Sequence, residues 1–178
     1  MLGQPIPAVR PGAAGRRLSL LNSDRHNLLK AWIAAVLWLI VIAIESTNLA
    51  SSTNTSRILY PLLHYLFGLD MVRFEHWHFF IRKGGHVVGY AILSILAFRA
   101  WRETFPARGS PLWTVRWSAI AIIMTALVAG LDEWHQTFIP SRTGRWQDVV
   151  LDTCAGIAAQ LLILMWMKSV PSRRTSIS

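Results

Sequence analysis

The sequence predicts an all-α fold, a polytopic membrane protein with a bundle of four transmembrane helices and a short interfacial helix between spans one and two. Of its 178 residues, 53% are hydrophobic and 15% are charged, whereas a soluble domain carries roughly 25% charged residues. The apolar residues are concentrated in long runs, which is typical of a membrane protein with several spans. The length suits one domain of a few helices, without a separate soluble catalytic domain.

The first 30 residues precede the first apolar run and are rich in proline, glycine and basic side chains. We therefore expect residues 1–30 to form a mostly disordered basic tail. The apolar run Ala31–Ile44 predicts the first span. A pre-region of about 30 residues is long for a signal peptide, which favours a retained signal-anchor helix.

Residues 51–82 contain a shorter apolar segment. Tyr60–Phe67 is apolar and aromatic, but Pro61 interrupts it, and a span needs about 20 residues. We expect a short interfacial or re-entrant segment here. The sequence leaves open whether residues 51–82 enter the bilayer or lie on it.

Three further spans follow at Ile81–Trp101, Trp113–Gln136 and Asp148–Lys168, before a polar C-terminal tail at residues 169–178. Lys and Arg residues near the span ends are more numerous on the side of the two termini. Because such residues favour the cytoplasmic side, we expect the N- and C-termini to be cytoplasmic. The start of span two, the end of span three and the start of span four then share the outer face.

The net charge is +9, from 18 basic and 9 acidic residues. The basic residues lie mostly between the apolar runs, so we interpret them as topology and lipid-headgroup charges and expect no nucleic-acid partner. The single cysteine, Cys154, cannot form an intramolecular disulfide.

Three charged motifs belong to the span ends that share the outer face. Charge within a membrane segment is costly and marks a functional site by default. Within each span the motif residues recur at steps of three or four, which places them on one helix face. The candidate ligand-binding residues are Lys83, His86, Tyr90, Asp132, Glu133, His135, Gln136, Arg142, Arg145, Asp148 and Asp152.

Each motif also has a purely structural interpretation. Arg82, at the start of span two, is typical of a snorkelling topology signal. Asp132 and Glu133 point about 100° apart on a helix, and we expect Asp132 to be the central one because it shares a face with Gln136. Asp152 lies a turn inside span four, where an unpaired carboxylate costs about 2.5 kcal/mol or more.

Four glycines in these spans, Gly84, Gly85, Gly89 and Gly156, permit close approach between helices. Packing of small residues alone is an equal interpretation.

Two chemistries suit such a cluster. Histidine with several carboxylates is a ligand set for divalent cations, but the sequence has no His-Glu-x-x-His motif, so we predict no metal site. Alternatively, Lys83, Arg142 and Arg145 clamp a phosphate. Asp132, His86 and Asp148 are then the candidates for catalytic roles. The sequence identifies no cofactor.

The motifs resemble those of the VanZ-like membrane protein family over about residues 30–168, with a transmembrane domain at 31–168. The residues that carry the resemblance are Lys83-x-x-His86-x-x-x-Tyr90, Asp132-Glu133-x-x-Gln136-x-Phe138-x-Pro140-x-Arg142 and Asp148-Val149-x-x-Asp152-Thr153-x-x-Gly156. The family more often has Asn at position 152 and Gly at position 141. The resemblance implies a multi-span bacterial inner-membrane protein, whose namesake is associated with low-level resistance to the glycopeptide teicoplanin. It implies no particular reaction.

A second likeness is to the third motif of type-2 phosphatidic acid phosphatases, through Ser141, Arg142, Asp148 and Asp152. Those enzymes carry a nucleophilic histidine where this chain has Asp148, so a phosphohistidine cannot form at that position. Only an aspartyl-phosphate or a metal-assisted variant of the reaction remains there.

Three hypotheses therefore stand. The first is a polar outer-face pocket that binds an anionic membrane lipid or a lipid-linked cell-wall precursor, in which Arg142 and Lys83 contact the phosphate. The second is a membrane-embedded lipid-phosphate hydrolase or transferase. The third is a structural protein whose salt-bridged core fixes the helix register.

Overall fold

The structure, a computed structural model, describes residues 12–47, 51–106, 112–140 and 142–169. Within these ranges it contains five helices and no strand: α1 (Ala13–Ser46), α2 (Ser52–Phe67), α3 (Met71–Thr104), α4 (Leu112–Gln136) and α5 (Trp146–Ser169). By length and composition, α1, α3, α4 and α5 can each cross a membrane. The all-α fold with four spans is therefore confirmed, and a short extra helix separates the first two spans.

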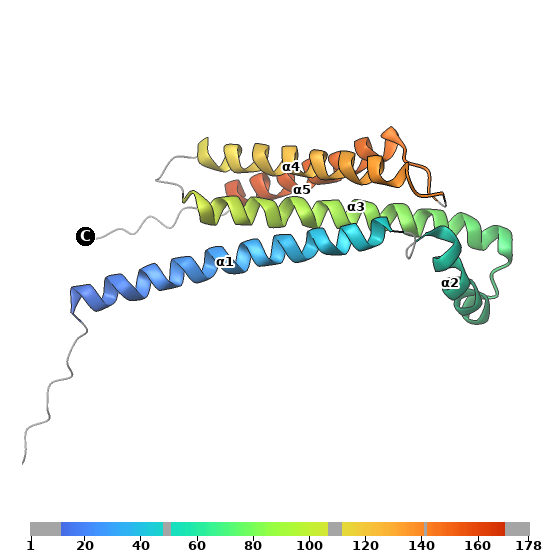
Figure 1. Cartoon of the computed structure of the whole chain (residues 1–178), viewed down its shortest axis with the longest axis horizontal. Helices are drawn as coiled ribbons and strands as arrows, with labels where there is room; N and C mark the ends of the chain where they lie inside the picture. The colour runs from blue at the N-terminus through green and yellow to red at the C-terminus, as the bar shows by residue number, and fades with distance from the viewer. Residues whose placement is uncertain (1–11, 48–50, 107–111, 141, 170–178) are drawn as a thin grey trace, which may run out of the picture.

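Helices α3, α4 and α5 pack against one another, and α1 runs along α3 (Figure 1). The N-terminal half of α1 extends past the bundle, and α2 packs against α3 at the opposite end. The end of α1, the start of α3, the end of α4 and the start of α5 all lie at the α2 end of the molecule. This arrangement brings the three charged motifs together at one end of the bundle.

The first helix is longer than the sequence predicts. It begins at Ala13, so residues 13–30, which we expected to be disordered, are helical; residues 1–11 lie outside the described part. No proline or glycine interrupts residues 16–46. Because each added residue extends an existing helix at little cost, the helix of the span propagates into the basic segment.

The third helix also begins earlier than predicted, at Met71 rather than Ile81. Asp70 caps it by accepting a hydrogen bond from the Arg73 N–H at 2.8 Å. With 34 residues, α3 is about 51 Å long, whereas the hydrocarbon core is about 30 Å thick. Its first turns therefore extend beyond the depth that the span requires, and they form a wall beside α2.

The short helix α2 spans Ser52–Phe67, with Pro61 in its interior. The apolar segment expected from the sequence, Tyr60–Phe67, forms only the second half of this helix. The Ser51 side chain accepts a hydrogen bond from the Asn54 N–H at 3.4 Å and caps the N-terminus. The helix ends at Gly68, whose φ of 62° is a left-handed conformation that favours glycine. With 16 residues, α2 is shorter than a span needs.

Two apolar clusters stabilise the bundle, and α3 contributes to both. The cluster nearer α2 contains Ile42, Tyr90, Leu93 and Ala129, and the farther one contains Ala97, Phe98, Trp117 and Ala121. Between them, Gln160 of α5 donates from Nε2 to the Ser94 backbone oxygen at 2.9 Å. The central helix of the fold is thus α3, which also carries the first charged motif.

Of the four glycines expected at close helix contacts, only Gly156 lies at one. A Cβ at Gly156 would stand 2.9 Å from the Thr125 Cγ2 atom, whereas a Cβ at Gly84, Gly85 or Gly89 would meet no atom within 4 Å. The expectation was wrong for these three positions, because α3 does not present them to a neighbouring backbone.

Candidate functional site

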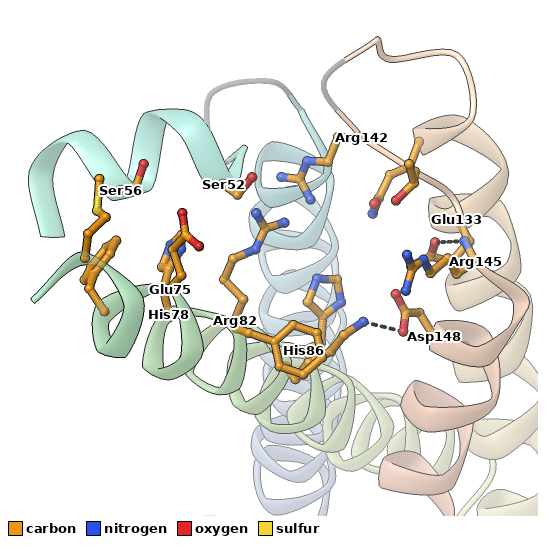
Figure 2. A pocket seen from close by; sticks show the side chains of 16 residues that line it. Ser52, Ser56, Glu75, His78, Arg82, His86, Glu133, Arg142, Arg145 and Asp148 are labelled. Atoms are coloured by element: carbon orange, nitrogen blue, oxygen red, sulfur yellow. Dashed lines mark hydrogen bonds and ion pairs between the residues drawn. The ribbon is translucent and has the colours of Figure 1, made fainter. Parts of the chain in front are cut away.

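A cavity of about 540 Å³ lies at the α2 end of the bundle, between α2, α3 and the junction of α4 with α5 (Figure 2). Four basic and three acidic side chains line it, together with two histidines. The charged lining residues are Arg82, Lys83, Arg142, Arg145, Glu75, Glu133 and Asp148, and the histidines are His78 and His86. The site is therefore a polar pocket with a slight excess of positive charge.

Seven of the eleven residues singled out from the sequence line this cavity: Lys83, His86, Glu133, Gln136, Arg142, Arg145 and Asp148. Tyr90, Asp132 and Asp152 are buried and are not among the lining residues. His135 is exposed, and its Nδ1 lies 3.1 Å from the Ser46 hydroxyl. Its contact joins α4 to the end of α1 rather than contributing to the pocket.

An ion pair and a histidine–carboxylate hydrogen bond join α3 to α5 at successive turns. Lys83 binds Asp148 at the cavity wall, and His86 Nδ1 lies 3.4 Å from Asp152 Oδ2. Lys83 and His86 are three residues apart on α3, and Asp148 and Asp152 are four apart on α5, so each pair of residues shares one helix face. Each spacing is close to one helical turn, so both pairs form between the same two helix faces.

Behind the cavity, the Asp132 carboxylate accepts two hydrogen bonds at the same oxygen. The Tyr90 hydroxyl donates at 3.0 Å and Gln136 Nε2 donates at 3.2 Å. All three side chains are buried, where hydrogen bonding offsets the cost of removing polar groups from water. Asp132 therefore ties α3 to α4 and does not line the cavity.

Its neighbour Glu133 is the residue of the pair that lines the cavity. We expected Asp132 to be central, and the α4–α5 loop explains the difference. The Arg145 N–H donates to Glu133 Oε2 at 2.7 Å (Figure 2), so the loop folds back over the end of α4. A Cβ at Gly144 would stand 2.2 Å from the Glu133 backbone oxygen, which shows how closely the loop approaches.

Arg142 has a structural contact that its sequence position does not suggest. Its Nη2 donates to the backbone oxygens of Glu45 and Thr47, the latter at 3.0 Å. It thereby satisfies carbonyl groups at the C-terminal end of α1, which no helical N–H can reach. Burial lowers the pKa of the Arg142 guanidinium, and Asp132, Glu133 and Glu45 oppose that shift. The side chain remains charged because an arginine pKa starts far above neutrality.

Arg82, which we interpreted as a topology signal, extends into the cavity. Figure 2 shows its guanidinium reaching toward that of Arg142, and the two like charges repel one another. No carboxylate of the described residues pairs with Arg82. Asp148 attracts Arg82 but pairs with Lys83, so Arg82 lies beside Arg142 without an ion-pair partner of its own among the described residues.

The α3 side of the cavity could have been predicted from the spacing of its polar residues. Glu75, His78, Arg82 and His86 follow one another at steps of three, four and four and share a helix face. We did not extend the pattern before Ile81 because we expected the helix to start there. Ser52 and Ser56, on the N-terminal part of α2 that we did not expect to be helical, also line the cavity.

In the described ranges, no group of three or more His, Cys, Asp or Glu side chains is arranged to hold a metal ion. The groups that meet in the cavity are instead three guanidiniums, an ammonium, three carboxylates and two imidazoles. Guanidinium pairs are suited to phosphate oxygens, to which they donate several hydrogen bonds in a fixed geometry.

A family model described as VanZ/LLP1 matches residues 31–167. No curated protein matches the chain, and no solved structure matches it.

Proposed function

This chain belongs to the VanZ/LLP1 family, and we propose that its cavity binds the phosphate group of an anionic membrane lipid or a lipid-linked cell-wall precursor. The observation that carries this proposal is Arg82, a cavity-lining cation without a carboxylate partner among the described residues. A phosphate between Arg82 and Arg142 would neutralise two charges that otherwise repel.

Two of the other cations of the cavity, Lys83 and Arg142, have different tasks in this proposal. Lys83 is paired with Asp148, so it contributes to the field of the site and holds α3 against α5. Arg142 is anchored through Nη2 to the end of α1. We therefore revise the sequence-based assignment, in which Lys83 and Arg142 made the phosphate contacts, and assign the main contact to Arg82.

Apolar residues beside the cations support a lipid rather than a free phosphate. Met71, Phe74 and Phe79 line the same cavity, and the side chains of Met71 and Phe79 are exposed. The adjacent helix α2 exposes Tyr65 and Phe67, at 86% and 70%. Aromatic residues favour the boundary between hydrocarbon and headgroups, so a headgroup in the cavity and an acyl chain along α2 and α3 suit this surface.

The proposal includes a location. Counting of basic residues favours cytoplasmic termini, which puts the cavity at the outer face of the bacterial inner membrane. A link to teicoplanin resistance, known for the namesake of the family, belongs to the same proposal. A protein that holds an anionic cell-wall precursor at that face changes how much of it is accessible to a glycopeptide.

We expect Arg82→Gln to weaken lipid binding about tenfold. A hydrogen bond to a charged group contributes about 1.5–3 kcal/mol, and the lower end applies because Arg82 is only partly buried. The measurement is native mass spectrometry of the full-length protein titrated with phosphatidylglycerol in detergent. Arg73→Gln is the matched control, because Arg73 is on the same helix, pairs with Asp70 and is 75% exposed.

Equal retention of phosphatidylglycerol by both variants and by the wild type would contradict the proposal. If Arg82→Gln instead lowered thermal stability without changing lipid retention, the charges would be a structural network, as in the third hypothesis. Cells that produce the two variants give a second readout: any teicoplanin protection by the wild type is lost only with Arg82→Gln.

A further inference from the structure

His86 and Asp152 form a dyad at the inner wall of the cavity. Asp152 is fully buried, at 0% exposure, and His86 Nδ1 lies 3.4 Å from its Oδ2. Its other oxygen, Oδ1, has no hydrogen-bond partner among the described residues. Because a buried carboxylate accepts a hydrogen bond most favourably from an N–H, the proton of the neutral imidazole resides on Nδ1.

This tautomer leaves the lone pair of His86 on Nε2. The His86 side chain lines the cavity, and Figure 2 shows its ring among the cavity side chains. No described residue hydrogen-bonds to Nε2. Arg82 and Lys83 lie four and three residues before His86 on α3, so both cations are on the same helix face as the ring.

The dyad has the parts of an activated nucleophile. A histidine attacks through one ring nitrogen while a carboxylate on the other orients the ring and stabilises the positive charge that develops. Among the described residues, no other histidine has a carboxylate partner. His78 Nε2 contacts the Thr55 hydroxyl at 2.9 Å, and His64 Nδ1 contacts the Leu69 oxygen at 2.8 Å.

We propose that His86 Nε2 is a nucleophile that takes the phosphoryl group from a phosphate monoester of a membrane lipid held in the cavity. The Nε2 lone pair forms a bond to phosphorus, and the bond between phosphorus and the lipid oxygen breaks. The leaving alkoxide takes a proton from a water molecule, which becomes hydroxide. That hydroxide then attacks phosphorus, the P–N bond breaks, and inorganic phosphate and free His86 result.

This inference rests on the proposed function, since the phosphate must first be bound near Arg82. In the reaction, Arg82 and Lys83 are suited to stabilise the charge on the transferring phosphoryl oxygens. Asp152 is a positioning residue, because it acts through His86 and does not line the cavity. Type-2 phosphatidic acid phosphatases carry their nucleophilic histidine at the position of Asp148, on α5. In this proposal the nucleophilic histidine is instead His86, on α3.

The test uses the purified full-length protein and phosphatidic acid carrying a ³²P phosphate. Samples are quenched in alkali, in which phosphohistidine is stable, and the protein-bound label is measured. We expect label on the wild type, loss of that label in His86→Gln because glutamine has no ring nitrogen to carry the phosphoryl group, and unchanged label in His76→Gln. His76 is the matched control because it is exposed, on the same helix and outside the cavity.

Asp152→Asn tests the positioning role. We expect labelling up to about 10⁴-fold slower per molecule of bound lipid, because an amide does not stabilise the charged imidazole. Retained phosphatidic acid without protein-bound label would overturn the nucleophile and leave the binding function standing. Label that persists in His86→Gln would also overturn it. If neither label nor lipid is retained, the proposed function fails, and this inference fails with it.

Discussion

Gly144 lies where the α4–α5 loop meets the last turn of α4. A Cβ at this position would stand 2.2 Å from the Glu133 backbone oxygen and 2.7 Å from the Thr137 Cγ2 atom. A backbone oxygen cannot move aside as a flexible side chain can, so any larger residue displaces the loop. The loop carries Arg142 and Arg145, which makes this contact a determinant of the cavity.

We expect Gly144→Ala to destabilise the protein by about 1–3 kcal/mol, the usual cost of overpacking. Gly84→Ala is the control, because a Cβ there meets no atom within 4 Å and alanine is the better helix former by about 1 kcal/mol. Thermal unfolding in detergent should give a lower midpoint for Gly144→Ala and an equal or higher one for Gly84→Ala. Equal midpoints for the two variants would show that the loop is not packed against α4 as described.

Arg142 shows how tertiary contacts assign a role to a charged residue. Sequence spacing placed it among the phosphate ligands, but its Nη2 satisfies carbonyls at the end of α1. The partner residues lie about 95 positions earlier in the chain, and backbone carbonyls leave no mark in a side-chain pattern. Arg82 is the opposite case. Its position at a span start suggested a topology signal, but its side chain lines the cavity.

At the level of secondary structure, the N-terminal turns of α3 are the element on which the cavity depends most. They carry Glu75, His78 and Arg82, and α2 packs against them. Asp70 caps this end by accepting the Arg73 N–H. The cap is exposed, so its substitution alters the helix end without opening a buried cavity.

We expect Asp70→Ala to loosen these turns. Loss of an N-cap costs about 1 kcal/mol, which corresponds to roughly fivefold faster amide hydrogen exchange if the turns open locally. Hydrogen-exchange mass spectrometry of residues 71–80 makes the measurement, with Asp24→Ala on exposed α1 as the control. Exchange that is unchanged in Asp70→Ala would mean that α2, and not the cap, holds this end of α3.

For the whole molecule, the orientation in the membrane decides where the cavity acts. The end of α3 and the start of α4 lie at the opposite end of the bundle from the end of α4 and the start of α5 (Figure 1). Reporter fusions after residues 106–110 and after residues 139–144 should therefore report opposite sides of the membrane. We expect the first group to be cytoplasmic and the second to be outside, because basic residues near the termini favour the cytoplasm. Both groups on one side would contradict the four-span arrangement.

The sequence by itself determined that the chain is an all-α membrane protein with four spans, and it selected residues that the fold gathers at one end. Apolar runs determine spans because lipid accepts no unpaired backbone group, and helical spacing determines faces because its period is local. Only the tertiary structure decided that Glu133 rather than Asp132 lines the cavity, that Arg142 caps α1, that Arg82 faces Arg142 and that His86 pairs with Asp152. These facts depend on contacts between segments far apart in the chain, which packing sets and local periodicity does not encode.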